Sequence, residues 1–169
     1  KECLYHHPEH SMASHLLAAM TGIKTNRAPA NYVRDLFDDY AETFDADLLE
    51  GLNYVVPDLI KSALETRLVS NGPKSAHRFD RVLDLGCGTG LVAQAIRPLA
   101  NDITGVDISP KMLEIALSKD RIDKAINSDM IDFLQSNEKD DRKFDLIVCG
   151  DALVYLGALE ELIDGVKHK

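Results

Sequence analysis

The pattern of apolar and polar residues changes along the chain. Upstream, apolar residues recur every three or four positions, which is the spacing of one helical face; Pro57 opens such a helix, with an apolar stripe of Leu59, Ile60, Ala63, Leu64 and Leu68. From Arg81 onward, short apolar runs alternate with helical segments. This alternation is typical of βαβ units, which build a parallel sheet covered by helices. The sequence therefore predicts an α/β fold whose ligand site lies beyond the carboxyl ends of the strands.

The elements can be placed approximately from these patterns. Residues 1–22 are expected to form one helix, and Asn31 is expected to cap a second helix with an apolar side of Val33, Leu36, Phe37 and Tyr40. The helix from Pro57 is expected to end at residues 70–73. The expected strands are residues 82–85, 102–106, 124–127 and 144–149, and the helices between and after them are residues 91–99, 110–118, 130–134 and 156–166.

The strongest signal is the nine-residue run V-L-D-L-G-C-G-T-G at positions 82–90, which joins the first expected strand to its helix. Glycines at every second position allow a tight turn and a close approach of the backbone to a ligand. The start of the next helix offers unpaired N–H groups. These features predict a site for a nucleotide or another polar, partly anionic ligand. A dinucleotide fingerprint, G-x-G-x-x-G/A, would need Gly or Ala at position 91, where this chain has Leu91.

This run resembles motif I of the Rossmann-like methyltransferases that use S-adenosylmethionine (SAM). The resemblance implies a three-layer Rossmann-like sheet and SAM as the cofactor. Upstream, residues 37–45 match the pattern Y/F-D-x-Y/W-A-x-x-Y/F-D, which many small-molecule methyltransferases carry as a lid over the cofactor. Tyr40 is then expected to contact the cofactor. The alternative for this segment is a solvated helical face whose aromatic rings pack on the main domain.

The resemblance also assigns roles to residues at the strand ends. Asp107 is expected to accept hydrogen bonds from both ribose hydroxyls of the cofactor. Asp84 lies either near the amino-acid end of SAM or bonds the amides of the glycine loop. Asp129 either accepts from the adenine amine or caps the helix that follows it. The other expected cofactor contacts are Gly86, Cys87, Gly88, Ile108, Met130 and Gly150.

The methyl acceptor is expected to be a small molecule. Asp151 and Tyr155 follow the fourth strand, where they could orient or deprotonate the acceptor. A base is optional, because in-line methyl transfer depends mainly on alignment. Two alternatives remain open: a non-catalytic module that binds SAM or a protein, and a NAD-dependent oxidoreductase, which Leu91 disfavours.

The resemblance also indicates how the chain is divided and which strands of the resembled fold it lacks. We expect an N-terminal helix and linker over residues 1–30, a helical lid over residues 31–72, and a SAM-binding domain over residues 73–169. In the resembled fold, further strands follow the helix at which this chain stops. The strand at residues 144–149 would otherwise remain an edge, so we expect those strands in a longer parent protein.

Charge and composition limit the kinds of partner that we expect for this protein. The formal net charge of −9 argues against nucleic acid, and no apolar run approaches the roughly 20 residues that cross a bilayer. Three cysteines without framework spacing favour a reduced, cytoplasmic protein. The N-terminal helix resembles the second helix of a tetratricopeptide unit, which leaves a protein partner open. Its histidines, His6, His7, His10 and His15, lack a ligand pattern, so no metal is expected.

Overall fold

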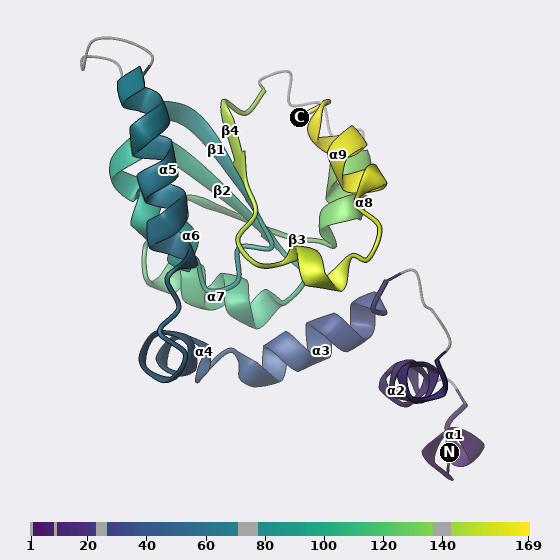
Figure 1. Cartoon of the computed structure of the whole chain (residues 1–169). Helices are drawn as coiled ribbons and strands as arrows, with labels where there is room; N and C mark the ends of the chain where they lie inside the picture. Colours follow the sequence, from purple (N-terminus) through teal and green to yellow (C-terminus); the bar gives the residue numbers. More distant parts are fainter. Residues whose placement is uncertain (1, 9, 23–26, 71–77, 137–142) are drawn as a thin grey trace.

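A parallel sheet covered by helices on both faces forms the body of the protein (Figure 1). The structure is a computed structural model that describes residues 2–8, 10–22, 27–70, 78–136 and 143–169. The sheet has four strands, in the order β3-β2-β1-β4. The strands are β1 (Phe79–Leu85), β2 (Ala100–Asp107), β3 (Lys124–Asn127) and β4 (Leu146–Val148). This arrangement confirms the predicted α/β, Rossmann-like fold.

Strand β1 is central, and its position decides where a ligand can bind. It pairs in parallel with β2 on one side and with β4 on the other. The chain runs outward from β1 through β2 to β3, and then crosses back to place β4 beyond β1. The direction of winding therefore reverses beside β1. In open parallel sheets, ligands bind at such a reversal, outside the carboxyl ends of the strands.

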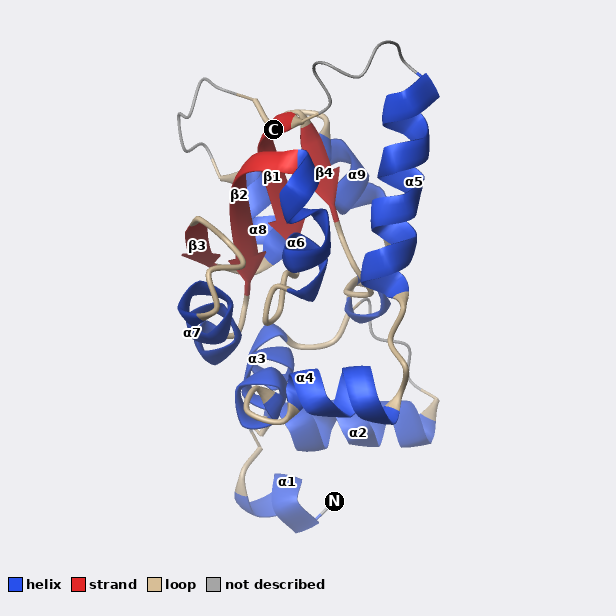
Figure 2. Ribbon diagram, turned by 90° about the vertical axis from the view of Figure 1, so that its left-hand side faces the viewer, coloured by secondary structure: helices blue, strands red, loops and turns tan. Residues whose placement is uncertain are grey.

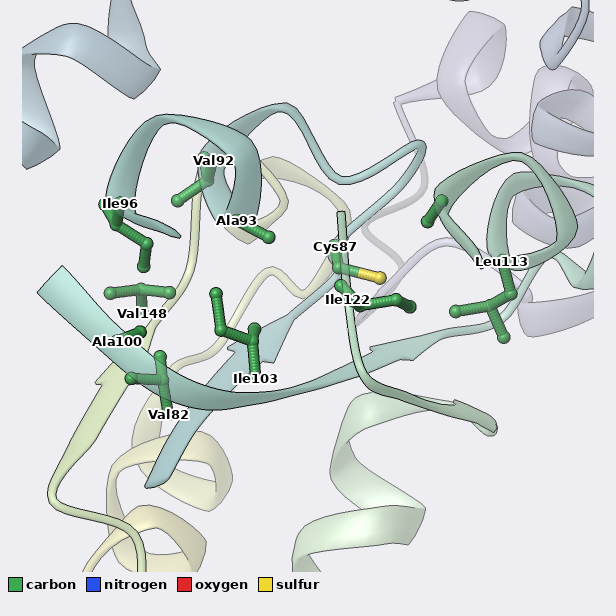
Figure 3. Close-up of a cluster of buried hydrophobic side chains, with 11 residues drawn as sticks. Val82, Cys87, Val92, Ala93, Ile96, Ala100, Ile103, Leu113, Ile122 and Val148 are labelled. Carbon is green, nitrogen blue, oxygen red and sulfur yellow. The ribbon is translucent and has the colours of Figure 1, made fainter. Parts of the chain in front are cut away.

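Helices α5 (Val56–Ser70), α6 (Leu91–Ile96) and α7 (Pro110–Ser118) cover one face of the sheet, while α8 (Met130–Gln135) and α9 (Glu160–Val166) cover the other (Figure 1). Side chains alternate along β1 between the two faces. Val82 joins the core cluster on the α6 side, which Figure 3 shows, and Leu83 and Leu85 join the cluster on the α8 side. The sheet is thus buried on both faces, as parallel sheets are.

The upstream segment contains α1 (Glu2–His6), α2 (Ser11–Thr21), α3 (Ala30–Tyr40), α4 (Phe44–Ala46) and a π-helical turn, Asp47–Gly51. Helices α3 and α4 lie across the carboxyl ends of the strands, and α1 and α2 lie farther from the sheet (Figures 1 and 2). Helix α3 contacts α7. None of the described helices is long and apolar enough to cross a bilayer.

Several upstream predictions were wrong in detail. In place of the single helix predicted over residues 1–22, the described residues form two, α1 and α2, because Pro8 lacks an N–H and restricts the residue before it. The N-cap of α3 is Pro29 rather than Asn31, whose side-chain oxygen accepts from the adjacent Tyr32 N–H. In α5, Ile60 and Leu64 pack on the core as predicted, but Leu59 is 62% exposed. The predicted boundary between residues 72 and 73 lies outside the described residues.

Downstream of Arg81 the differences are smaller. Helix α6 ends at Ile96 and continues as a 3-10 turn, Arg97–Leu99, because Pro98 cannot donate an α-helical hydrogen bond. Strand β4 is shorter than residues 144–149. The helix predicted over residues 156–166 begins later, at Glu160, as α9, and a 3-10 turn, Leu153–Tyr155, precedes it.

Candidate functional site

A cavity of about 300 Å³ opens at the carboxyl ends of the strands, between the glycine loop and the upstream helices. Its walls come from the loop after β1, the ends of β2 and β3, helices α3 and α4, and residues 150–156. Of the twelve predicted site residues, ten line the cavity; Asp84 and Cys87 do not. The ten are Tyr40, Gly86, Gly88, Asp107, Ile108, Asp129, Met130, Gly150, Asp151 and Tyr155.

Asp107 ends β2 with its carboxylate held in a fixed orientation. Its Oδ2 accepts from the Gly88 N–H at 2.8 Å, and its Oδ1 accepts from the Ser109 N–H at 2.8 Å. Burial raises the pKa of this carboxyl above its usual value, although the two N–H groups act in the opposite direction. Each carboxylate oxygen can accept more than one hydrogen bond. Asp107 can therefore still accept from two donors on a ligand in the cavity.

The glycine loop is a close-fitting turn with positive φ angles. Gly86 and Cys87 both donate backbone hydrogen bonds to the Val106 carbonyl, which ties the loop to β2. Gly86 has a φ of +67°, and a Cβ there would lie 2.5 Å from the Ala152 Cβ. Gly88 has a φ of +53°, and a Cβ there would lie 3.8 Å from the Phe44 ring. Glycine at these positions keeps the turn possible and the cavity open.

We expect Gly86→Ala to lower the free energy of unfolding by about 2–4 kcal/mol, because it adds a clash to an unfavourable φ. Gly51→Ala is the matched control, since a Cβ there would have no atom within 4 Å and its φ is not positive. That change is expected to be neutral or to stabilise by about 0.4–1 kcal/mol. Urea unfolding followed by circular dichroism measures both. Equal effects of the two substitutions would contradict the described packing of the loop.

Asp84 is a buried carboxyl group without a partner. It is 0% exposed, and neither carboxylate oxygen has a hydrogen-bond partner among the described residues. Burial and the nearby Asp107 carboxylate raise its pKa to about 7; the Ala93 N–H lowers it in part without reaching hydrogen-bond geometry. The alternative in which Asp84 bonds the amides of the glycine loop is therefore wrong. A cationic group on a ligand would compensate the negative charge of an ionised Asp84.

Two residues predicted to contact the cofactor, Cys87 and Gly150, have a role in packing. The Cys87 side chain is buried in the core cluster rather than directed to the cavity (Figure 3). Only the Cys87 backbone belongs to the loop. Gly150 lines the cavity, but a Cβ there would lie 2.6 Å from the Val92 Cγ2. The absence of a side chain at Gly150 thus serves the packing of α6.

Asp129 lines the cavity and also caps α8. Its Oδ1 accepts from the Ile131 N–H at 2.9 Å and from the Asp132 N–H at 3.4 Å, so Asp129 is the N-cap of α8. The same oxygen accepts from Arg27 Nη1 at 3.2 Å. Arg27 was not predicted as a site residue, yet it lines the cavity and ties the upstream segment to the end of β3.

Four aromatic rings form the roof of the cavity. The ring of Phe37 lies edge-on to Phe44 and Tyr155, with centroids 6.2 and 5.4 Å apart, and Tyr40 lies 5.3 Å from Phe44. All four line the cavity. Burial raises the pKa of Tyr155, with Tyr32 and Asp151 adding to the rise, so this phenol stays protonated at neutral pH. We call these four residues the aromatic roof.

Tyr54 is a site residue that the sequence did not indicate. It follows the π-helical turn and lines the cavity. Burial raises its pKa to about 12, and the nearby carboxylates of Asp151 and Asp84 add to the rise. Tyr54 therefore stays protonated and can donate a hydrogen bond. A single tyrosine in a loop has no pattern that would have distinguished it.

The histidines of the N-terminal segment form no described metal site. Within the part of the chain that the structure describes, no three His, Cys, Asp or Glu side chains are grouped so that they could hold a metal ion. The His10 Nδ1 accepts from the Ala13 N–H at 3.4 Å, at the start of α2.

Comparison with protein families gives a match over the α/β half. Residues 83–168, which are 86 of the 169 residues, match the family described as a methyltransferase domain. A magnesium-protoporphyrin O-methyltransferase of Rhodobacter capsulatus is 36% identical over 80 residues, 46% of this chain and 34% of that protein. A mitochondrial ubiquinone biosynthesis O-methyltransferase of Schizosaccharomyces pombe is 25% identical over 143 residues, 80% of this chain and 49% of that protein. The chain thus spans at most about half the length of these curated relatives.

Solved structures share the fold. An S-adenosylmethionine-dependent methyltransferase from Clostridium acetobutylicum has a TM-score of 0.56 at 26% identity, covering 79% of this chain and 52% of that one. A magnesium protoporphyrin IX methyltransferase from Synechocystis, solved with bound SAM, has a TM-score of 0.56 at 22% identity, covering 82% of this chain and 69% of that one.

Proposed function

Because the chain belongs to the methyltransferase domain family, we propose that its cavity binds SAM and that the protein methylates a small-molecule acceptor. The observation that carries the proposal is the Asp107 carboxylate. It lies at the end of β2, beside the glycine loop, and two backbone N–H groups fix its orientation at the cavity wall. An acceptor-only group in this place suits the paired hydroxyls of a ribose.

The other cavity residues fit the remaining parts of SAM. Ile108 and Met130 offer apolar contacts for an adenine ring, and Asp129 lies beside them with a carboxylate that can accept from its amine. Below the loop, Asp84 has a carboxyl group without a partner. The ammonium group of SAM, reaching it directly or through water, would supply the missing positive charge.

SAM supplies a methyl group on a positively charged sulfur, activated for transfer to a nucleophile. The residues of this chain would align the acceptor and keep water out, which accounts for most of the rate in such a displacement. The aromatic roof covers the cavity, and its π faces suit a neighbouring cation. We propose that Asp151, Tyr155 and Tyr54 orient the acceptor, with Asp151 placed to take its proton where the acceptor carries one.

The relatives suggest the class of acceptor. The proteins from Rhodobacter capsulatus and Schizosaccharomyces pombe are named as O-methyltransferases of magnesium-protoporphyrin and of ubiquinone biosynthesis. In this chain the cavity combines apolar side chains, such as Leu48 and Leu52, with the phenols of Tyr54 and Tyr155. These residues support a small organic acceptor with an apolar ring or chain.

Isothermal titration calorimetry tests the proposal. We expect SAM and its demethylated product S-adenosylhomocysteine (SAH) to bind with one site per chain, and NAD to show no saturable heat. The reasons are Asp84, whose carboxyl group suits the cation of SAM and not the phosphates of a dinucleotide, and Leu91, which stands where a dinucleotide fingerprint needs Gly or Ala. Binding of NAD without binding of SAM or SAH would overturn the proposed function.

A further inference from the structure

The lid segment is tied to the glycine loop by one carboxylate that the proposed chemistry does not use. Asp45, in α4, accepts at Oδ1 from the Thr89 hydroxyl at 2.5 Å. Its Oδ2 accepts from Lys119 Nζ at 2.6 Å and from Arg121 Nη1 at 2.8 Å. Thr89 belongs to the glycine loop, and the two cations follow α7. Asp45 thus joins three segments that are distant in sequence.

Arg121 is built into the back of the same loop. Its side chain is only 10% exposed, and its Nη1 also donates to the Thr89 carbonyl at 2.9 Å. Gly90 has a φ of +83°, and a Cβ there would lie 2.9 Å from the Arg121 Cβ. The last glycine of the loop therefore leaves room for Arg121. The guanidinium therefore contacts both the glycine loop and Asp45.

The contact between Asp45 and its partners is ionic. Burial would raise the pKa of Asp45, but hydrogen bonds from Lys119, Thr89 and Arg121 outweigh burial, so the pKa lies below its usual value. Asp45 is consequently ionised at neutral pH, and its side chain is 18% exposed. An ion pair shielded to this degree holds its geometry better than a surface pair does.

The residue next to Asp45 belongs to the aromatic roof. The Phe44 ring lies 3.8 Å from the Cβ position of Gly88, directly over the cavity side of the loop, and it also contacts the Tyr40 ring. Neither Asp45 nor Arg121 lines the cavity. Because Asp45 directly follows Phe44, holding Asp45 against the loop also holds the Phe44 ring over the cavity.

We propose that Asp45 and Arg121 form a latch, defined by these two residues, which holds the aromatic roof closed over the glycine loop. They act as positioning residues: they raise the fraction of molecules with a formed cavity and do not touch the cofactor. The apparent dissociation constant equals the intrinsic constant divided by that fraction, so loss of the latch raises it. This inference rests on the proposed binding of SAM.

The upstream segment has other attachments, so loss of the latch leaves a folded protein. Asp38 accepts from the Ser109 hydroxyl at 2.5 Å, and Arg27 pairs with Asp129 at 3.2 Å. Asp35→Asn is a matched control for Asp45→Asn, because it makes the same chemical change in the same lid. Asp35 pairs with Arg34 at 2.8 Å, but both side chains are exposed and neither lines the cavity.

Calorimetry with SAH, used on the whole chain, tests the latch. We expect Asp45→Asn and Arg121→Met each to weaken binding roughly ten- to a hundredfold. The double variant is expected to lose less affinity than the product of the two single losses, since both substitutions break the contact between Asp45 and Arg121. Asp35→Asn is expected to bind within about twofold of the unaltered protein, because surface pairs contribute little.

A second readout separates positioning from general stability. The chain contains no tryptophan, so Tyr40→Trp introduces a single indole into the roof. In this background and without ligand, Asp45→Asn is expected to increase acrylamide quenching of the indole about twofold or more at a temperature where the fold is intact. Asp35→Asn is expected to leave quenching unchanged.

The outcomes distinguish the two proposals. If the unaltered protein binds SAH and Asp45→Asn binds it equally well, the latch is wrong and the proposed function stands. If quenching and affinity stay constant while only the melting temperature falls, Asp45 is a structural residue and the latch is again wrong. If the unaltered protein does not bind SAH, the proposed function fails, and the latch fails with it.

Discussion

Replacing Asp107 with alanine is expected to weaken the binding of SAM and SAH at least a hundredfold. Hydrogen bonds to a charged acceptor contribute about 1.5–3 kcal/mol each, and two ribose hydroxyls would lose theirs. Each 1.4 kcal/mol corresponds to a tenfold change in affinity. The substitution also removes the acceptor for the Gly88 and Ser109 N–H groups, which loosens the loop itself. Calorimetry with SAH measures the loss.

Asp102→Ala is the control on the same strand. Asp102 lies in β2 on the side away from the carboxyl ends and does not line the cavity. We expect its replacement to leave the affinity for SAH within about twofold, since a partly exposed charge outside the site contributes little. Equal affinities of Asp107→Ala and the unaltered protein would show that the ribose assignment is incorrect.

Asp84→Asn is expected to stabilise the ligand-free protein at alkaline pH and to weaken SAM binding. Burial raises the folded-state pKa of Asp84 from its ordinary value of 3.8 to about 7. A carboxyl with a raised folded pKa contributes stability that is complete below the unfolded pKa and is lost as the pH rises through the folded pKa. Above pH 7 the unaltered protein thus carries an ionised, unpartnered carboxylate, whereas the amide stays neutral.

The size of this effect follows from the shift. The rise in the pKa of Asp84 from 3.8 to about 7 is linked to about 4 kcal/mol in total, of which roughly 2–3 kcal/mol is lost between pH 5 and pH 8. The advantage of Asp84→Asn over the unaltered protein should therefore grow by roughly 2–3 kcal/mol across that interval. Urea unfolding at pH 5 and pH 8 measures it. A pH-independent difference in stability would mean that Asp84 does not titrate in this range.

The same variant has the opposite effect on binding. If the ammonium of SAM compensates Asp84, the amide removes that charge, and the affinity for SAH is expected to fall roughly tenfold or more at pH 8. A residue that lowers the stability of the free protein and improves ligand binding is typical of a functional site. Unchanged affinity would contradict a contact between Asp84 and the cationic end of the cofactor.

Local sequence patterns predicted the half of the fold in which local and tertiary preferences agree. The run from Val82 to Gly90 combines a buried strand with a turn that only glycine accepts, and β1, the loop and α6 follow it closely. Helix α7 has the predicted limits because Ser109 caps it and Pro110 suits its first turn.

Other features depend on contacts that no local pattern encodes. Cys87 lies in the glycine loop, yet its side chain packs in the core, because the loop bends back against β2. Leu59 has the helical spacing of a core residue but is exposed, whereas Ile60 and Leu64 on the same helix pack on the core. Tyr54 and the Asp45–Arg121 contact join segments far apart in sequence, so only the structure reveals them.

A crystal structure of the protein soaked with SAH would locate the cofactor itself. We expect a nucleoside in the cavity, with both ribose hydroxyls within about 3 Å of the Asp107 carboxylate oxygens and the adenine between Ile108 and Met130. Density for SAH at another surface, with the crevice above Gly86–Gly88 filled by side chains, would contradict it.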